Sequence, residues 1–129
     1  AVPVTNLDAG TKVRFTAITR TSATGHKFWR MEYNDGGTWK PAAALQTTTE
    51  TGEEVSYTHA MKADGKTNIT VDVTVTYANA ISGGNIEFRF VCAANWQASG
   101  KGALTKPNGG TMRWAGAGTA DSPRIQIVP

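Results

Sequence analysis

The stretch NITVDVTVTY (residues 68–77) alternates polar and apolar side chains without interruption. The apolar side chains that fall on one face of an extended chain are Ile69, Val71, Val73, Val75 and Tyr77. Successive side chains of a β-strand point to opposite faces, so this stretch predicts a strand with one face in a core and the other in solvent. Strands covered on one side only are typical of antiparallel sheets.

The same alternation predicts strands elsewhere in the chain. These are residues 13–20, 27–34, 54–60 and 85–92, with shorter ones at 111–114 and 124–128. Asp-Gly within NDGG (34–37) predicts a tight hairpin, and ADGK (63–66) and SGGN (82–85) predict further turns. No segment has convincing helical periodicity, and AAALQTTTET (42–51) is expected to be extended or to form a single turn. We therefore expect an all-β fold, an antiparallel β-sandwich.

Length and composition set the domain organisation. A chain of 129 residues with 40% hydrophobic and 18% charged residues is expected to form one domain, residues 1–129. Its single cysteine excludes the Cys–Trp–Cys immunoglobulin type, so a jelly roll is the expected sandwich. No apolar run is long enough to span a membrane, and the start, AVPVTNLDAG, lacks the features of a targeting signal, so we expect no membrane insertion. The net charge of +3 comes from Lys and Arg residues spread singly along the chain, so nucleic acid is not an expected partner.

Candidates for catalysis and metal binding are few. His59 falls on the apolar side of a strand and is expected to be half-buried, whereas His26 in a turn has no ligand-type neighbour at metal-binding spacing. Cys92 is expected to be buried as a small hydrophobic residue. Nucleophile-elbow, zinc-protease and phosphate-loop motifs do not occur. We expect neither a catalytic site nor a metal site.

Charged residues on the polar strand faces leave three interpretations open. Glu32 and Glu87 could approach each other across a sheet, with Arg30 and Arg89 two residues away on the same faces and Arg14 nearby. Alternating Arg and Glu forms a solvated charge ladder in the simplest case. The same groups could bind sugar hydroxyls, because they supply donors and acceptors in fixed geometry. A catalytic pair like that of glycosidases is the third interpretation.

The chain has four tryptophans in different sequence contexts. Trp29 alternates with Met31 and Tyr33 and is expected in the core. Trp39 follows the predicted hairpin turn and is expected at the edge of the sandwich, and Trp114 ends a short predicted strand.

Trp96 lies in a long Gly-rich stretch, residues 93–110, between Asn95 and Gln97. Long irregular loops on a rigid scaffold often carry function. An exposed ring there could stack on the apolar face of a pyranose while the two amides bind hydroxyl groups. The alternative is that Trp96 folds back and closes the end of the sandwich.

Two longer segments carry a resemblance to a known family. LDAGTKVRFTAITRTSATGHKFWRMEYNDGGTWKPA (7–42) resembles the opening half of galactose-binding-domain-like jelly rolls, and TNITVDVTVTYANAISGGNIEFRFVCAAN (67–95) resembles their paired inner strands. The family includes non-catalytic carbohydrate-binding modules and accessory domains of secreted or surface bacterial proteins, which implies an extracytoplasmic location. Many members end with an acidic strand near a structural calcium, whereas this chain ends SPRIQIVP (122–129). Calcium therefore has no supporting ligand motif, and no other cofactor is expected.

These observations combine into one hypothesis and two alternatives. The expected function is a non-catalytic carbohydrate-binding module of a larger secreted or cell-surface protein, with a polysaccharide or oligosaccharide and the neighbouring domains of that protein as partners. The expected ligand-binding residues are Trp96, Asn95, Gln97, Arg89, Glu87, Trp39 and Trp114. The main alternative is a structural spacer or protein-interaction β-sandwich without a glycan site, and an enzyme is the third.

Overall fold

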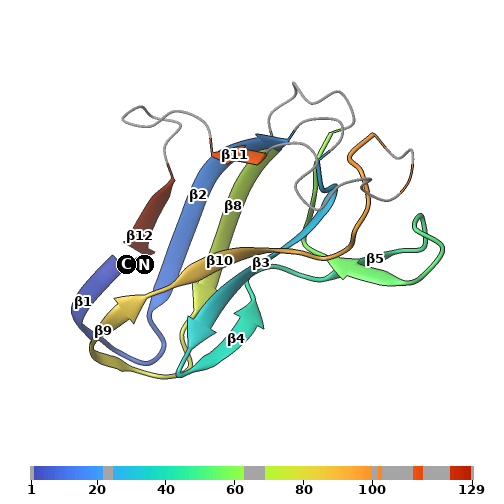
Figure 1. Ribbon diagram of the computed structural model, residues 1–129. Helices are drawn as coiled ribbons and strands as arrows, with labels where there is room; N and C mark the ends of the chain where they lie inside the picture. The colour runs from blue at the N-terminus through green and yellow to red at the C-terminus, as the bar shows by residue number, and fades with distance from the viewer. Residues whose placement is uncertain are drawn as a thin grey trace.

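Two antiparallel sheets of four strands each lie face to face in the computed structural model (Figure 1). The structure describes residues 2–21, 25–62, 69–99, 102, 112–114 and 123–128. The strands of the first sheet are β2 (Lys12–Thr21) in the middle, β8 (Ile69–Thr76) on one side, and β12 (Arg124–Val128) and β11 (Met112–Trp114) on the other. The strands of the second are β3 (Phe28–Asp35) in the middle, β10 (Phe88–Cys92) on one side, and β4 (Thr38–Pro41) and β7 (His59–Ala60) on the other.

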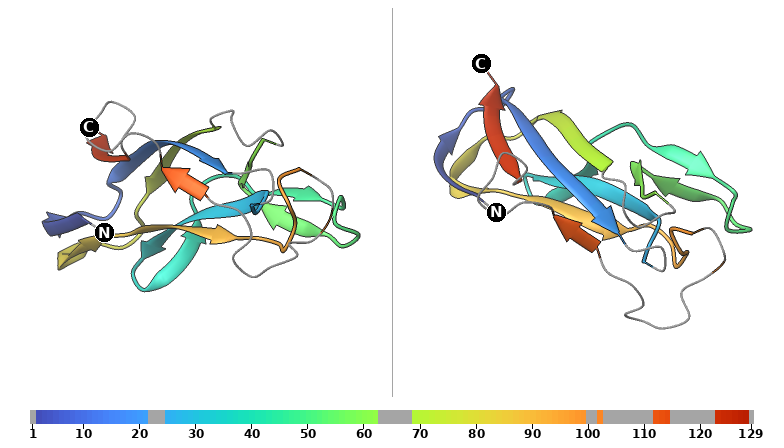
Figure 2. Two further views of the ribbon diagram at one scale, coloured as in Figure 1. Left: turned by 45° about the horizontal axis from the view of Figure 1, so that its top comes forward. Right: turned by 90° about the horizontal axis from the view of Figure 1, so that it is seen from above.

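Two smaller ribbons extend the sandwich at its ends (Figure 2). One pairs β1 (Val2–Leu7) with β9 (Ile81–Ile86), and the other is a hairpin of β5 (Gln46–Thr48) and β6 (Val55–Tyr57). Every pairing among these strands is antiparallel, and no described residue lies in a helix. The described part of the chain accordingly offers no helix suited to crossing a membrane. The expected all-β, sandwich-like architecture of antiparallel sheets is thus present.

The core lies between the two sheets, as the alternating sequence predicts. Its buried side chains include Val13, Phe15 and Ala17 of β2, Val71, Val73 and Val75 of β8, and Met31 and Tyr33 of β3. Phe15 of the first sheet stacks on Phe88 of the second, with ring centroids 5.3 Å apart. A smaller cluster forms around Trp29, whose ring lies 5.0 Å from that of Phe90. The prediction that Trp29 belongs to the core is confirmed.

Most strand predictions are confirmed, and the hairpin at NDGG joins β3 to β4. Gly36 and Gly37 have φ angles of 64° and 92°, which the two central positions of this tight turn require. Several predictions are wrong. The predicted strand 85–92 is divided at Glu87 between β9 and β10. Residues 82–85 form part of β9 and not a turn, because β1 pairs with them and places Val4 opposite Gly84.

The predicted strand 54–60 is also interrupted, at Thr58. This residue is buried, and its hydroxyl accepts a hydrogen bond from the Met31 amide at 2.8 Å. His59 is half-buried as expected, 2.7 Å from the Thr58 hydroxyl, and burial lowers its pKa. Cys92 is exposed, contrary to expectation, because β10 ends there. The predicted turn at 63–66 lies outside the described residues.

A buried carboxylate closes the turn end of β3. The Asp35 side chain is fully buried and accepts hydrogen bonds from Lys40 Nζ at 2.7 Å and from the Ala78 amide at 2.9 Å. The backbone and side-chain nitrogens of Asn79 donate to it at 3.0 and 3.1 Å. Burial by itself would raise the pKa of Asp35, but these hydrogen bonds outweigh burial and hold the pKa at about 2. Asp35 therefore ties the β3–β4 hairpin to the segment between β8 and β9.

Candidate functional site

Two segments that are distant in sequence meet beside the beginning of β3. One is the loop that follows β10, and the other is the β5–β6 hairpin (Figure 1). The Lys27 amide donates to the Trp96 carbonyl at 2.9 Å, and the Ala98 amide donates to the Gly25 carbonyl at 2.8 Å. These bonds fix the backbone of the loop at Trp96 and directly after it.

Glu50, at the tip of the hairpin, holds the Trp96 side chain in place. Its carboxylate accepts the indole N–H at 2.7 Å and also binds Lys27 Nζ, at 2.8 and 2.9 Å. The hydrogen bond from Lys27 lowers the pKa of Glu50, partial burial opposes this, and the bond from Trp96 lowers the pKa further. Glu50 is therefore a charged acceptor that orients the ring. Its role could not be predicted from the sequence, because 46 residues separate it from Trp96.

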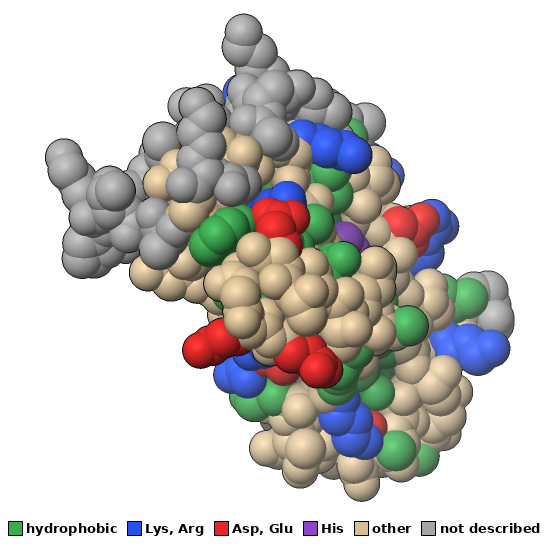
Figure 3. Space-filling model, turned by 90° about the vertical axis from the view of Figure 1, so that its right-hand side faces the viewer, with side chains coloured by type: hydrophobic (Ala, Val, Ile, Leu, Met, Phe, Trp, Pro, Cys, Tyr) green, Lys and Arg blue, Asp and Glu red, His purple; other side chains and the backbone are tan. Residues whose placement is uncertain are grey.

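An open depression of about 500 Å³ lies between the hairpin and the loop. The side chains in its lining that could recognise a ligand are Arg30, Glu53, Glu54, Ser56, Asn95 and Trp96. Arg30 comes from the outer face of β3, and its guanidinium donates to the Ser56 carbonyl at 3.3 Å. Figure 3 shows this end of the molecule, where acidic and basic side chains are interspersed. One indole ring surrounded by amide, hydroxyl, carboxylate and guanidinium groups suits a ligand with many hydroxyls.

Farther along β3, the outer face of the same sheet carries another tryptophan, Trp39, stacked with an arginine. Arg89 of β10 lies opposite Glu32 of β3, and its Nε donates to that carboxylate at 2.8 Å. The Arg89 guanidinium also packs 4.1 Å from the centre of the Trp39 ring. Trp39 thus lies on strand β4 at one side of the sheet, covered on one face by a cation.

Of the three interpretations of the charged faces, this geometry most resembles the charge ladder. Glu32 is ion-paired with Arg89, and Glu87 accepts a hydrogen bond from the Asn34 side chain at 3.4 Å. Arg14 does not join them. It lies in the other sheet, where it binds Asp72 through two hydrogen bonds of 2.9 and 2.8 Å.

The predicted ligand-binding residues fall in three places. Asn95 and Trp96 line the depression, and Gln97 follows them, forming a β-bridge with His26 and accepting a hydrogen bond from Ser99 at 3.2 Å. Arg89, Glu87 and Trp39 belong to the outer face of the second sheet. Trp114 ends β11 in the first sheet, opposite Thr19, and its side chain lies outside the described part of the structure.

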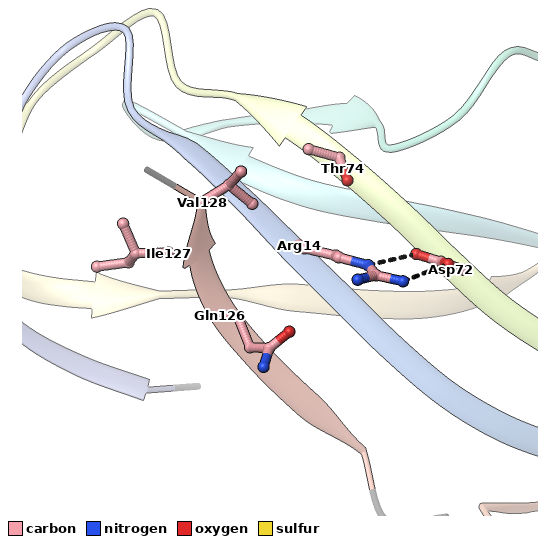
Figure 4. A pocket seen from close by; sticks show the side chains of 6 residues that line it. All are labelled: Arg14, Asp72, Thr74, Gln126, Ile127 and Val128. Atoms are coloured by element: carbon pink, nitrogen blue, oxygen red, sulfur yellow. Dashed lines mark hydrogen bonds and ion pairs between the residues drawn. The ribbon is translucent and has the colours of Figure 1, made fainter.

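A second depression, of about 590 Å³, lies on the outer face of the first sheet (Figure 4). Its lining consists of Arg14, Asp72, Thr74, Gln126, Ile127 and Val128. The ion pair of Arg14 and Asp72 spans β2 and β8, and none of the described residues that line this depression is aromatic. It lacks the flat apolar platform that distinguishes the depression at Trp96.

Metal-binding groups do not converge in the described ranges. Within them, no group of three or more His, Cys, Asp or Glu side chains is placed to hold an ion.

Comparisons with models of known families, with curated proteins and with solved structures give no match to this chain.

Proposed function

We propose that this chain is a non-catalytic carbohydrate-binding module of a larger secreted or cell-surface bacterial protein. The observation that carries the proposal is the half-buried indole of Trp96, held by Glu50 at the margin of an open polar depression. The sandwich is proposed to be a jelly roll of the galactose-binding type. The pairing of β2 with β12, which encloses that of β3 with β10 in sequence, supports this topology.

Recognition of a sugar would use the ring and its polar neighbours together. The apolar face of a pyranose would pack against Trp96, while Asn95 and Arg30 donate hydrogen bonds to hydroxyl oxygens. Glu53 and Glu54 would accept hydrogen bonds from hydroxyl groups. Because Glu50 already fixes the indole, binding costs little side-chain entropy. The two carboxylates outnumber the one guanidinium in the lining, which favours a neutral sugar over an acidic one.

The arrangement of the carboxylates favours binding of a sugar without its hydrolysis. A glycosidase needs two carboxyl groups flanking the bound sugar, one of them poised as an acid. Glu32 is engaged by Arg89, and Glu87 is contacted by Asn34, on a part of the face that does not line the depression. Glu53 and Glu54, which do line it, are adjacent in sequence and both exposed, so neither lies in the apolar surroundings that suit a general acid.

The alternative function is a spacer or protein-interaction domain without a glycan site. In that case Trp96 serves only to close this end of the sandwich. The hydrogen bond between its indole and Glu50 is the observation that favours this alternative, since the N–H is already satisfied within the chain.

Affinity electrophoresis against neutral and acidic polysaccharides tests the proposal. The wild type is compared with Trp96→Ala and with Trp39→Ala, a matched control that removes a half-buried tryptophan of β4 outside the depression. We expect Trp96→Ala to weaken binding at least about tenfold, as loss of a stacking aromatic does. Trp39→Ala should retain binding. If no polysaccharide retards the wild type, or if both variants lose binding equally, the proposed site is wrong.

A further inference from the structure

The short strand β7 joins the chain that leaves the β5–β6 hairpin to the central strand β3. It consists of His59 and Ala60, and both residues pair with β3. Just outside them, the amides of Thr58 and Met61 donate to carbonyl groups at and just before the start of β3, at 2.9 and 2.8 Å. A pairing this short can open locally at a smaller cost in free energy than unfolding of the whole domain.

The Thr58 hydroxyl, next to β7, has three neighbours and one hydrogen to share among them. It accepts a hydrogen bond from the Met31 amide at 2.8 Å, and it lies 2.7 Å from Nδ1 of His59 and 3.4 Å from the Trp29 carbonyl. The shorter distance favours donation of the hydroxyl hydrogen to Nδ1, which then carries no hydrogen of its own. This geometry assigns His59 a neutral ring with its hydrogen on Nε2.

The surroundings of the His59 ring do not compensate for a positive charge. The ring is half-buried, and its aromatic neighbour is Phe90 of β10, with ring centroids 5.8 Å apart. The described titratable or charged side chains on the surrounding elements are Arg89 and Cys92 of β10, His26, Lys27, Arg30 and Glu32 around the start of β3, Glu50, Glu53 and Glu54 of the hairpin, and Lys62 after β7. Burial is the influence that shifts the pKa of His59, and it lowers this pKa, so none of these carboxylates offsets the charge.

We propose that His59 is an acid-sensitive switch: the neutral ring keeps β7 paired with β3, and protonation in mildly acidic solution releases it. Protonation places a hydrogen on Nδ1, so the Thr58 hydroxyl must turn its own hydrogen toward the Trp29 carbonyl at 3.4 Å. That carbonyl already accepts the Thr58 amide at 2.9 Å. The charged ring is also half-buried, and opening of β7 exposes it to water.

The direction of the pH dependence follows from the protonation state of His59 in the open and paired states. In the open state the ring has its ordinary pKa of 6.5, whereas burial lowers the pKa when β7 is paired. The contribution of the neutral ring is therefore fully present above pH 6.5 and is lost as the pH falls from 6.5 toward the lowered value. Asp35 acts in a separate range, because its charge is lost only below its ordinary pKa of 3.8.

Release of β7 would also free one end of the β5–β6 hairpin. Strand β6 contributes Ser56 to the lining of the depression, and the tip of the hairpin contributes Glu50, which holds Trp96. Acid should therefore weaken glycan binding as well, a consequence that rests on the proposed function. The opening of β7 itself requires no ligand, so it can be measured whether or not a glycan binds.

Amide hydrogen exchange of the full chain, from about pH 7.5 to about pH 5 and corrected for the intrinsic effect of pH on exchange, tests the proposal. Protection at Thr58 and Met61 should fall as the pH drops below 6.5. Because one proton is bound, the fall should be at most about tenfold for each pH unit. Protection at Val73, in the middle of β8, should not change over this range.

Two variants and one spectrum separate His59 from other causes. His59→Gln should abolish the pH dependence at Thr58 and Met61, whereas the matched control His26→Gln, which removes the other histidine, should keep it. In the wild type, the imidazole NMR signals of His59 should titrate below pH 6.5 and show Nδ1 without hydrogen at neutral pH. This readout does not depend on any variant folding.

Constant protection at Thr58 and Met61 in the wild type would overturn the proposal. So would titration of His59 at or above pH 6.5, or a pH dependence that survives His59→Gln or disappears in His26→Gln. Protection that depends on pH in a chain that binds no polysaccharide would support the switch and contradict the proposed function alone.

Discussion

A carboxylate bound to a lysine lies at each end of β3, one from β3 itself and one from the β5–β6 hairpin, and the two carboxylates do different things. At the turn end, Asp35 is fully buried and accepts hydrogen bonds from Lys40, Ala78 and Asn79. At the other end, Glu50 is partly exposed and accepts hydrogen bonds from Lys27 and Trp96. Both carboxylates have a lowered pKa.

Burial decides what each carboxylate can do. A buried carboxylate surrounded by donors joins backbone segments, and its loss leaves those donors without partners. A carboxylate at the surface can exchange its partners with water or a ligand at little cost. The Asp35 end therefore supports the fold, whereas the Glu50 end is suited to present a side chain to a ligand.

The largest effect that follows from this comparison is the loss of stability on Asp35→Ala. The substitution leaves the Ala78 and Asn79 amides without their acceptor, so we expect a loss of about 3 kcal/mol in the free energy of unfolding. Urea denaturation of wild type and variant measures it. Asp72→Ala, which removes an exposed ion pair with Arg14, is the control and should change stability little. Equal effects of the two substitutions would show that burial does not distinguish these carboxylates.

Lowering the pH should protonate Asp35 and thereby destabilise the fold. The pKa of Asp35 is about 2 in the folded chain, below the ordinary value of 3.8, so its ionised form stabilises the fold. This contribution is fully present above the ordinary value and is lost as pH falls toward about 2. Between these pH values, the urea midpoint of the wild type should fall more steeply than that of Asp35→Asn. Parallel pH profiles would contradict the assignment.

Glu50→Gln should have a smaller effect on stability and a measurable effect on ligand binding. The amide keeps an acceptor for the Trp96 indole but loses the charge that binds Lys27. We expect stability to change by less than about 1 kcal/mol and glycan affinity to fall several-fold as the ring becomes less ordered. Isothermal titration calorimetry with the best-binding polysaccharide measures the affinity of Glu50→Gln. Glu87→Gln, which lies outside the depression, is the control. A loss of affinity confined to Glu87→Gln would place the site elsewhere.

The smallest effect is expected for Tyr77→Phe. Its hydroxyl is buried and makes no hydrogen bond of ordinary geometry within the described structure, although the Glu87 backbone lies near it. Burial together with the nearby Asp35 charge outweighs the Glu87 contact and raises the pKa of Tyr77 to about 12. Removing an unsatisfied hydroxyl should leave stability unchanged or raise it by up to about 1 kcal/mol. Thermal unfolding measures the change. A clear loss of stability would indicate that the hydroxyl has a partner.

Local patterning predicted much of the fold. Uninterrupted alternation identified β2, β3, β8 and β12, because one face of each strand meets the core. It failed where pairing with a distant segment overrides local preference. The sequence predicts a turn at residues 82–85, which contain Gly83 and Gly84. Ser82, Gly84 and Asn85 instead pair with β1 as part of β9, and only Gly83 keeps a positive φ, of 65°.

The candidate site was less predictable than the fold. Trp96 and Asn95 could be selected from the sequence, because an aromatic ring beside an amide in a long loop is an unusual combination. Glu50 could not, because its contact with Trp96 depends on how the β5–β6 hairpin folds over the start of β3. The Arg89–Trp39 stack depends likewise on the register of β10 and β4 on β3.

Tryptophan indole N–H signals in a two-dimensional nitrogen–proton NMR spectrum test the glycan site most directly. Titration with the best-binding polysaccharide should shift the Trp96 indole signal most, because its N–H lies at the margin of the depression, bonded to Glu50. The Trp29 signal, from a buried indole bonded to the His26 carbonyl at 2.9 Å, should stay in place. Signals are assigned through Trp→Phe variants. A titration that leaves the Trp96 signal unmoved while the polysaccharide binds would contradict the account.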